Sequence, residues 1–198
     1  MTLLLIAGLA ACDKQSPPTE QASGQASGQA KVQTTADEAP GGATKDGFDY
    51  KVDRSKAGTA APDLAFQDAD GRDTTLRAFA GRPMLVNLWA TWCAPCVAEM
   101  PMLDGIAAEY GPKGLAVLTI SQDLQAAPIK GFFDKHALPH LKGWHDPENR
   151  LGFHYATGVL PTSVLYDAQG KETVRVVGAM DWSDAEGRTL IDAAMTAR

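Results

Sequence analysis

From about residue 61 onward, hydrophobic and polar positions along the chain follow a regular pattern. There, apolar runs of strand length are separated by segments whose apolar residues have helical spacing. Strands are predicted at residues 63–67, 74–76, 84–90, 115–120, 162–166 and 173–177. Helices are predicted at residues 95–110, 126–136, 147–155 and 184–197. Helices that alternate with strands in this way predict a single three-layer α/β domain over residues 61–198.

Two of the predicted strand regions are informative in detail. Residues 63–67 and 74–76 flank Asp70-Gly71, a turn dipeptide that predicts a small hairpin ahead of the main sheet. Residues 84–90 form an almost unbroken apolar run, which is typical of a strand buried on both faces. We therefore expect this strand at the centre of the sheet.

Residues 13–60 have a different composition, rich in Gln, Ala, Ser, Gly, Pro and Thr, and a Gln-Ala-Ser-Gly tetrapeptide occurs twice in succession from Gln21. Such a segment buries too little apolar surface to offset its ordering entropy, so it predicts a flexible linker. Near its end, Phe48, Tyr50 and Val52 alternate with polar residues, which predicts a short strand that docks onto the domain.

The first twelve residues predict an export signal. The apolar stretch Met1–Ala11 is shorter than the roughly 20 residues that span a bilayer, but it suits the apolar region of a secretory signal. The Leu-Ala-Ala-Cys sequence that ends at Cys12 resembles a bacterial lipobox, in which the cysteine becomes the lipidated first residue of the mature protein. The front of the segment lacks Lys and Arg, so an unlipidated N-terminus with a buried cysteine is the alternative. By the same resemblance, Asp13 favours retention at the inner membrane.

Composition excludes several classes of function. The chain has 18 Lys and Arg against 24 Asp and Glu, a net charge of −6, and so lacks the basic excess of a nucleic-acid-binding protein. Its three cysteines, Cys12, Cys93 and Cys96, are too few for a disulfide-stapled miniprotein. An enzyme or a binding domain with one informative cysteine pair remains.

That pair lies where the predicted central strand is followed by a helix. Cys93 is expected at or just before the first helical turn, where unpaired backbone N–H groups and the helix dipole stabilise an anion. The thiolate is the nucleophile in disulfide exchange, so this position lowers the pKa of Cys93. Cys96 lies one turn further along, where it can attack a mixed disulfide and release the partner. Pro95 lacks an N–H and suits the first turn.

Two structural interpretations compete with redox exchange. A zinc site needs about four ligands, and there is no second cysteine pair; the histidines also follow no zinc-ligand spacing, so no metal site is predicted. Those histidines are His136, His140, His145 and His154. A purely structural disulfide between Cys93 and Cys96 would close a loop too short to constrain the unfolded chain much. Redox exchange is the stronger interpretation.

Residues 61–198 resemble the thioredoxin superfamily, in particular the TlpA/ResA/CcmG group of membrane-tethered periplasmic thiol–disulfide oxidoreductases. The resemblance rests on Trp-Cys-Ala-Pro-Cys at residues 92–96 and on Gly-Val-Leu-Pro-Thr at residues 158–162, directly before a strand. It implies a thioredoxin fold with an N-terminal β-hairpin extension and a central insertion. It also implies a cis Pro161 that faces the cysteines, whereas a trans proline that only begins a strand is the alternative. The substrate-binding residues that it implies are Trp92, Ala94, Pro95, Leu160 and Pro161.

Two positions differ from thioredoxin itself. Asn87 stands where thioredoxin has a buried strand aspartate, and an amide cannot accept that proton. Glu99, three residues after Cys96, lies on the same side of the helix and matches an acidic residue of ResA-like proteins. A buried Glu99 with a raised pKa would accept the Cys96 proton during exchange, which adds Glu99 to the candidate catalytic residues. An exposed Glu99 that only complements the helix dipole is the alternative.

The remaining large side chains near the cysteines are assigned to packing or to the surface. Trp89 is expected in the core, and Trp92 is expected to shape the surface around Cys93. Met100 and Met102 could suggest copper binding, but core packing is the simpler use of methionine.

These observations predict an extracytoplasmic thiol–disulfide oxidoreductase anchored to the bacterial membrane by lipidated Cys12. Cys93 attacks the disulfide of a client protein and Cys96 resolves the mixed disulfide. The resemblance implies reduction of clients, with electrons from a membrane reductant of DsbD/CcdA type and with apocytochromes c or cuproprotein assembly factors as clients. No tightly bound cofactor and no nucleic acid are implied, and a monomer is the default.

Other classes make different demands on the sequence. A peroxiredoxin would have threonine three residues before its reactive cysteine, where this chain has Ala90. A Sco-type copper chaperone would have a wider cysteine spacing and a dedicated histidine. The main alternative is a thioredoxin-fold protein that binds partners or copper without turnover.

Overall fold

The computed structural model describes residues 49–197. The predicted signal with Cys12, and residues 13–48 of the predicted linker, lie outside the described residues. Along the chain the elements are β1 (Tyr50–Asp53), β2 (Phe66–Gln67), β3 (Asp73–Thr74), η1 (Leu76–Phe79), β4 (Met84–Trp89), α1 (Ala94–Tyr110), η2 (Gly111–Lys113), β5 (Ala116–Ser121), α2 (Ala126–Lys135), β6 (Trp144–His145), α3 (Arg150–Tyr155), β7 (Thr162–Tyr166), β8 (Glu172–Gly178) and α4 (Ala185–Thr196). None of the helices in residues 49–197 is both long and apolar enough to span a membrane.

The eight strands form one mixed sheet in the order β1-β8-β7-β4-β5-β6-β2-β3. Strand β4 lies inside it, parallel to β5 and antiparallel to β7. Its side chains alternate between two cores: Leu85 and Trp89 belong to one, and Val86 and Leu88 belong to the other. All six residues of β4 are buried, which confirms the predicted strand with two buried faces.

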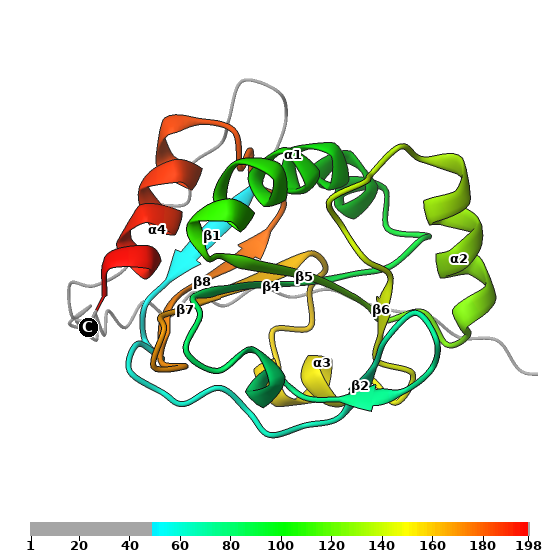
Figure 1. Cartoon of the computed structure of the whole chain (residues 1–198), viewed down its shortest axis with the longest axis horizontal. Coiled ribbons are helices and arrows are strands. Elements are labelled where there is room, and N and C mark those ends of the chain that lie inside the picture. Colours follow the sequence, from blue (N-terminus) through cyan, green and yellow to red (C-terminus); the bar gives the residue numbers. More distant parts are fainter. Residues whose placement is uncertain (1–48, 198) are drawn as a thin grey trace, which may run out of the picture. The chain divides into compact units, whose positions relative to one another are not determined.

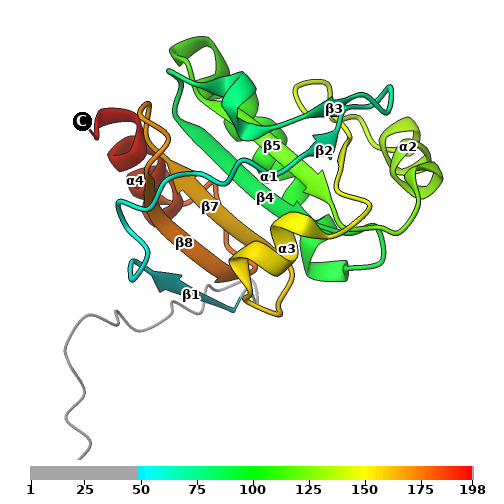
Figure 2. The same cartoon turned by 90° about the horizontal axis from the view of Figure 1, so that it is seen from below.

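Helices cover both faces of the sheet (Figure 1). Helices α1 and α4 lie on one face, where Met100, Leu103 and Ile191 join the core that contains Trp89. Helix α3 crosses the opposite face (Figure 2), and its buried Leu151 joins the second core. The predicted three-layer α/β architecture is confirmed.

The packed domain begins earlier than the change in composition near residue 61. Strand β1 pairs antiparallel with β8, and its Tyr50 and Val52 are buried, so the predicted docking strand is confirmed. Composition did not place the boundary here because only alternate residues of β1 contribute to the core. Strand β2 pairs antiparallel with β3 around Asp70-Gly71, which confirms the predicted hairpin.

Between β5 and α3 the chain inserts α2 and β6. Strand β6 was not predicted, because two residues are too few to give a hydrophobic pattern; it pairs with β5 and with β2, and so connects the hairpin to the sheet. Helix α3 begins at Arg150 rather than at the predicted Pro147. The reason is that the carboxylate of Asp146 accepts hydrogen bonds from the backbone N–H groups of Arg150 (3.0 Å) and Leu151 (2.8 Å) and starts the helix there.

Candidate active site

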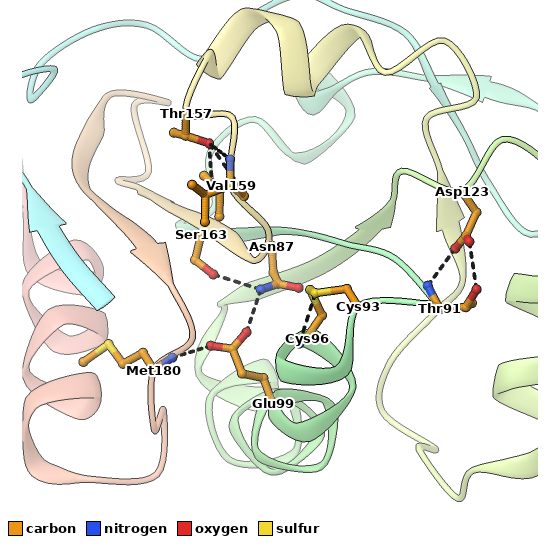
Figure 3. The surroundings of a disulfide bond; sticks show 11 residues. Asn87, Thr91, Cys93, Cys96, Glu99, Asp123, Thr157, Val159, Ser163 and Met180 are labelled. Atoms are coloured by element: carbon orange, nitrogen blue, oxygen red, sulfur yellow. Dashed lines mark hydrogen bonds between the residues drawn. A yellow bond between two sulfur atoms is a disulfide. The ribbon is translucent and has the colours of Figure 1, made fainter. Parts of the chain in front are cut away.

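Cys93 and Cys96 form a disulfide at the N-terminus of α1 (Figure 3). Cys93 is the N-cap residue of this helix, and its Sγ accepts a hydrogen bond from the backbone N–H of Cys96 at 3.4 Å. Cys93 is 6% exposed and Cys96 1% exposed, so Cys93 is the more accessible of the two residues. The prediction that Cys93 lies at the N-terminus of a helix is confirmed.

A short loop connects β4 to this helix. The backbone N–H of Cys93 donates to the carbonyl of Ala90 at 3.1 Å, which closes the loop into a turn. Trp89, at the end of β4, is fully buried, as predicted, whereas Trp92 is 71% exposed. The side chains of Ala94 and Pro95 are also exposed, so the surface beside Cys93 consists of residues that the sequence assigned to substrate binding.

The second motif of the sequence lies beside the first. The peptide bond between Leu160 and Pro161 is cis, so the alternative of a trans proline is wrong. Pairing of Thr162 on β7 with Leu88 on β4 brings this segment to the end of β4, where the cysteine loop begins. Pro161 is buried, and Leu160 is half-buried and packs against the core cluster that contains both cysteines.

Glu99 is buried behind the disulfide, with 1% of its surface exposed. The alternative of an exposed Glu99 that only complements the helix dipole is therefore wrong. Its Oε1 accepts a hydrogen bond from the backbone N–H of Met180 at 2.6 Å, and its Oε2 accepts one from Nδ2 of Asn87 at 3.3 Å (Figure 3). Burial raises the pKa of Glu99 to about 8, and these hydrogen bonds, which favour the carboxylate, offset only part of that rise.

Asn87 connects Glu99 to the strand that follows the cis-proline. Its Nδ2 also donates to Oγ of Ser163 on β7 at 2.9 Å. Among residues 49–197, the Oδ1 atom of Asn87 is buried without a hydrogen-bond partner. The indole of Trp182 also lies close enough to Glu99 to favour its carboxylate form and lower its pKa. A buried polar region with unused hydrogen-bonding capacity is unusual in a protein core, and here it surrounds a carboxyl group on the same helix as Cys96.

An apolar cleft of about 420 Å³ opens beside Trp92. It is lined by Leu88, Trp92, Gln122, Asn149, Gly152, Phe153, Ala156, Thr157, Gly158, Val159 and Leu160. Three of its residues are unusually exposed for large apolar side chains: Phe153 at 75%, Trp92 at 71% and Val159 at 46%. The sequence analysis did not single out Phe153, although a signal existed: Leu151 and Tyr155 mark the buried face of α3, and Phe153 lies off that face.

The two methionines considered for copper binding, Met100 and Met102, pack in or against the core. Met100 is fully buried, and Met102 packs against the same core cluster. Within the described part of the chain, no group of three or more His, Cys, Asp or Glu side chains could hold a metal ion.

Comparison with protein families matches residues 56–191, more than half of the chain, to the family model described as Redoxin. Among curated proteins, the chain is 31% identical over 136 residues to the thiol-disulfide oxidoreductase ResA of Oceanobacillus iheyensis, covering 67% of this chain and 70% of that protein. It is 28% identical over 141 residues to ResA of Bacillus anthracis, covering 71% of this chain and 81% of that protein.

Solved structures give the same result. A putative thiol:disulfide interchange protein DsbE from Chlorobium tepidum superposes with a TM-score of 0.64 at 27% identity, covering 70% of this chain and 96% of that one. A putative thiol-disulfide oxidoreductase from Bacteroides vulgatus gives 0.63 at 29% identity, with 70% and 96% covered. An exposed lipoprotein thioredoxin from Streptococcus pneumoniae gives 0.57 at 27% identity, with 66% and 99% covered.

Proposed function

We propose that this protein, a thiol–disulfide oxidoreductase of the redoxin family, reduces client disulfides outside the cytoplasm while tethered to the membrane. It has a thioredoxin fold and is similar to ResA and CcmG. The observation that carries the proposal is the position of Cys93: it caps α1 directly after Trp92, which lines an apolar cleft, while Glu99 lies buried on the same helix.

The first step uses the more accessible cysteine. In the reduced protein, the Cys93 thiolate attacks one sulfur of the client disulfide, and a mixed disulfide forms between Cys93 and the client. The second client sulfur leaves as a thiolate and takes up a proton. The N-terminus of α1 stabilises the attacking thiolate, because its unpaired N–H groups and its dipole favour a negative charge.

The second step releases the client. Cys96 gives its proton to the carboxylate of Glu99, and the Cys96 thiolate attacks Sγ of Cys93. The bond between Cys93 and the client breaks, and the client sulfur that was bonded to Cys93 leaves as a thiolate. Two electrons have then passed from the cysteine pair to the client. Because burial raises the pKa of Glu99 to about 8, this group can accept a proton near neutral pH and hand it on afterwards.

The client is held in the cleft and against the proline loop, which is the segment of residues 157–161 before β7. The apolar side chains of Trp92 and Phe153 offer contact area to residues that flank the client cysteine. Within residues 49–197, the backbone N–H and carbonyl of Leu160 have no hydrogen-bond partner, so an extended client segment can pair with them. The exposed Ala94 and Pro95 complete the surface around the disulfide, and the buried cis-proline Pro161 holds the backbone of Leu160 beside it.

We also propose that lipidated Cys12 anchors the protein and that residues 13–48 tether the domain. The lipobox-like sequence supports this, as does the likeness to a pneumococcal protein described as an exposed lipoprotein thioredoxin. Cys12→Ala should move the protein from the membrane fraction to the soluble fraction and abolish incorporation of labelled palmitate. A Cys12→Ala protein that stays with the membrane would contradict the anchor.

The proposed partners follow from the resemblance. Electrons would come from a membrane thiol reductant of DsbD/CcdA type, and the clients would be apocytochromes c or cuproprotein assembly factors. The location would be the periplasmic side of the inner membrane, and the protein would act as a monomer.

One pair of experiments tests the function. The wild type should catalyse reduction of insulin by dithiothreitol, and Cys93→Ser should not; a wild type without turnover would leave a thioredoxin-fold binding protein as the function. In cells, Cys96→Ser should accumulate mixed disulfides with clients, whereas the Cys93→Ser/Cys96→Ser double variant should trap none. Trapped apocytochromes would support cytochrome maturation, and a broad spread of envelope proteins would contradict it in favour of general reduction.

A further inference from the structure

A buried carboxylate lies beside the active-site loop. Asp123 follows β5 and is 5% exposed. None of the ion pairs in residues 49–197 involves it, and its two carboxyl oxygens accept three hydrogen bonds. A charged group without a cation is costly to bury, and it is retained in a fold only where its hydrogen bonds compensate.

Two of those hydrogen bonds come from one residue of the loop, Thr91. Thr91 donates its backbone N–H to Oδ2 of Asp123 at 2.9 Å and its hydroxyl to Oδ1 at 2.8 Å (Figure 3). Both oxygens of the carboxylate are thus used on a single residue. Since Thr91 is two positions before Cys93, this pair of bonds restrains the turn that presents the reactive sulfur.

The carboxylate is itself held from behind. The hydroxyl of Ser121 donates to Oδ2 of Asp123 at 2.7 Å, and the backbone N–H of Asp123 donates to that same hydroxyl at 3.0 Å. Nε2 of His145, on β6, lies 2.7 Å from the backbone carbonyl of Asp123 and must carry the proton, because a carbonyl can only accept. Asp123 is therefore fixed to β5 and β6, neither of which contains a cysteine.

We propose that Asp123 is a positioning residue for thiol–disulfide exchange, which holds Thr91 so that Cys93 remains the cap of α1 after the disulfide opens. In the oxidised protein the bond to Cys96 also restrains Cys93. In the reduced protein that restraint is absent, and the contacts of the loop alone determine where the sulfur lies. The reduced protein is the form that attacks a client, so the hydrogen bonds between Asp123 and Thr91 matter most at that step.

The inference rests on the proposed role of Cys93, and the test separates the two. In the reduced full-length protein, the rate at which iodoacetamide alkylates Cys93 is measured against pH by mass spectrometry of the peptide that carries it. Thr91→Val removes the hydroxyl bond but retains the charge of Asp123 and the backbone bond. Thr119→Val is the matched control: this buried threonine on β5 donates its hydroxyl to the carbonyl of Lys142 at 3.2 Å, away from the loop.

We expect Thr91→Val to slow alkylation of Cys93 at pH 7 by about fivefold, the size that loss of one hydrogen bond allows. Thr119→Val should leave the rate of alkylation within about twofold of the wild type, even if it lowers the thermal midpoint as much as Thr91→Val does. In an Asp123→Ala background, Thr91→Val should have no further effect, because the acceptor of its hydroxyl is gone. If Asp123→Ala does not fold, the comparison of alkylation rates in Thr91→Val and Thr119→Val still tests the positioning role.

An unchanged rate in Thr91→Val, or an equal loss in Thr119→Val, would overturn the positioning role while leaving Cys93 as the nucleophile. A wild-type Cys93 that reacts no faster than an ordinary thiol would instead contradict the proposed function itself.

Discussion

The two sides of the Cys93–Cys96 disulfide have opposite character. On the outer side, Trp92 and Phe153 are 71% and 75% exposed, although both are large and apolar. On the inner side, Glu99 and Asn87 are each 1% exposed, although both are polar. Folded proteins usually have the reverse distribution, since exposed apolar surface favours association and buried polar groups lose hydration.

Stability alone does not explain either side, and the contrast indicates a division of labour. The outer side can bind another protein, and the inner side can hold or release a proton in a place that water does not reach. The disulfide lies between them: Cys93 is the more exposed of the two cysteines, and the more buried Cys96 shares α1 with Glu99. Changing one side at a time should therefore affect different steps of the reaction.

The largest expected effect comes from the inner side. Glu99→Gln should slow release of the client from the mixed disulfide by about 100-fold at pH 8, the size of a typical general-base contribution. In the wild type this rate should rise with pH and level off above about 8, where Glu99 is ionised. Quenched-flow measurement of client release from pH 6 to 9 provides the test.

The matched control for this step is Glu109→Gln, which alters a partly exposed carboxyl group on the same helix. Attack by Cys93 below pH 7 should remain unchanged in Glu99→Gln, because Glu99 is then protonated and the amide is neutral as well. Equal release rates in wild type and Glu99→Gln would remove the proton-transfer role from the inner side.

A second effect of the inner side concerns stability against pH. The folded protein holds the Glu99 proton up to a pKa of about 8, whereas the unfolded chain loses it near the ordinary value of 4.5. Unfolding between these values releases a proton, so raising the pH through this window destabilises the folded state. Relative to Glu99→Gln, the free energy of unfolding of the oxidised wild type should fall by up to about 1.4 kcal/mol per pH unit. Urea denaturation at pH 5, 6, 7 and 8 measures it, and parallel pH dependences for the two proteins would show that the carboxyl group titrates normally.

The outer side should give a smaller effect of a different kind. Phe153→Ala should raise KM for a protein client by about fivefold, the cost of losing part of one buried aromatic contact, with little change in kcat. Reduction of a small disulfide such as hydroxyethyl disulfide should be unaffected. Leu124→Ala is the control, because Leu124 is 87% exposed but does not line the cleft. The same rise in KM for Leu124→Ala would mean that general surface stickiness, and not the cleft, binds the client.

Local patterns were sufficient to predict much of this site. The apolar run of β4, the Trp-Cys-Ala-Pro-Cys sequence and the proline motif before β7 each specify a structure within a few residues. For Glu99 the sequence left two environments open, buried or exposed. Helical spacing gives the side of α1 on which Glu99 lies but not what packs against that side. The deciding contact is the N–H of Met180, which is 81 positions away along the chain.

The parts that the sequence did not predict depend on such distant contacts. Strand β6 exists because β5 and β2 pair with it on both sides. Asp123 resembles any loop aspartate until the fold brings it against Thr91, 32 positions earlier. Phe153 lines the cleft only because α3 lies across the sheet and brings it beside residues 157–160.

The most direct test of the account is a titration of Cys93 in the reduced protein, followed by thiolate absorbance and by alkylation of the peptide that carries it. The account predicts that Cys93 ionises well below the pKa of about 8.5 of an ordinary cysteine, and that Cys96 ionises at higher pH. A Cys93 that ionises at 8.5 or above would contradict the claim that the N-terminus of α1 activates this sulfur.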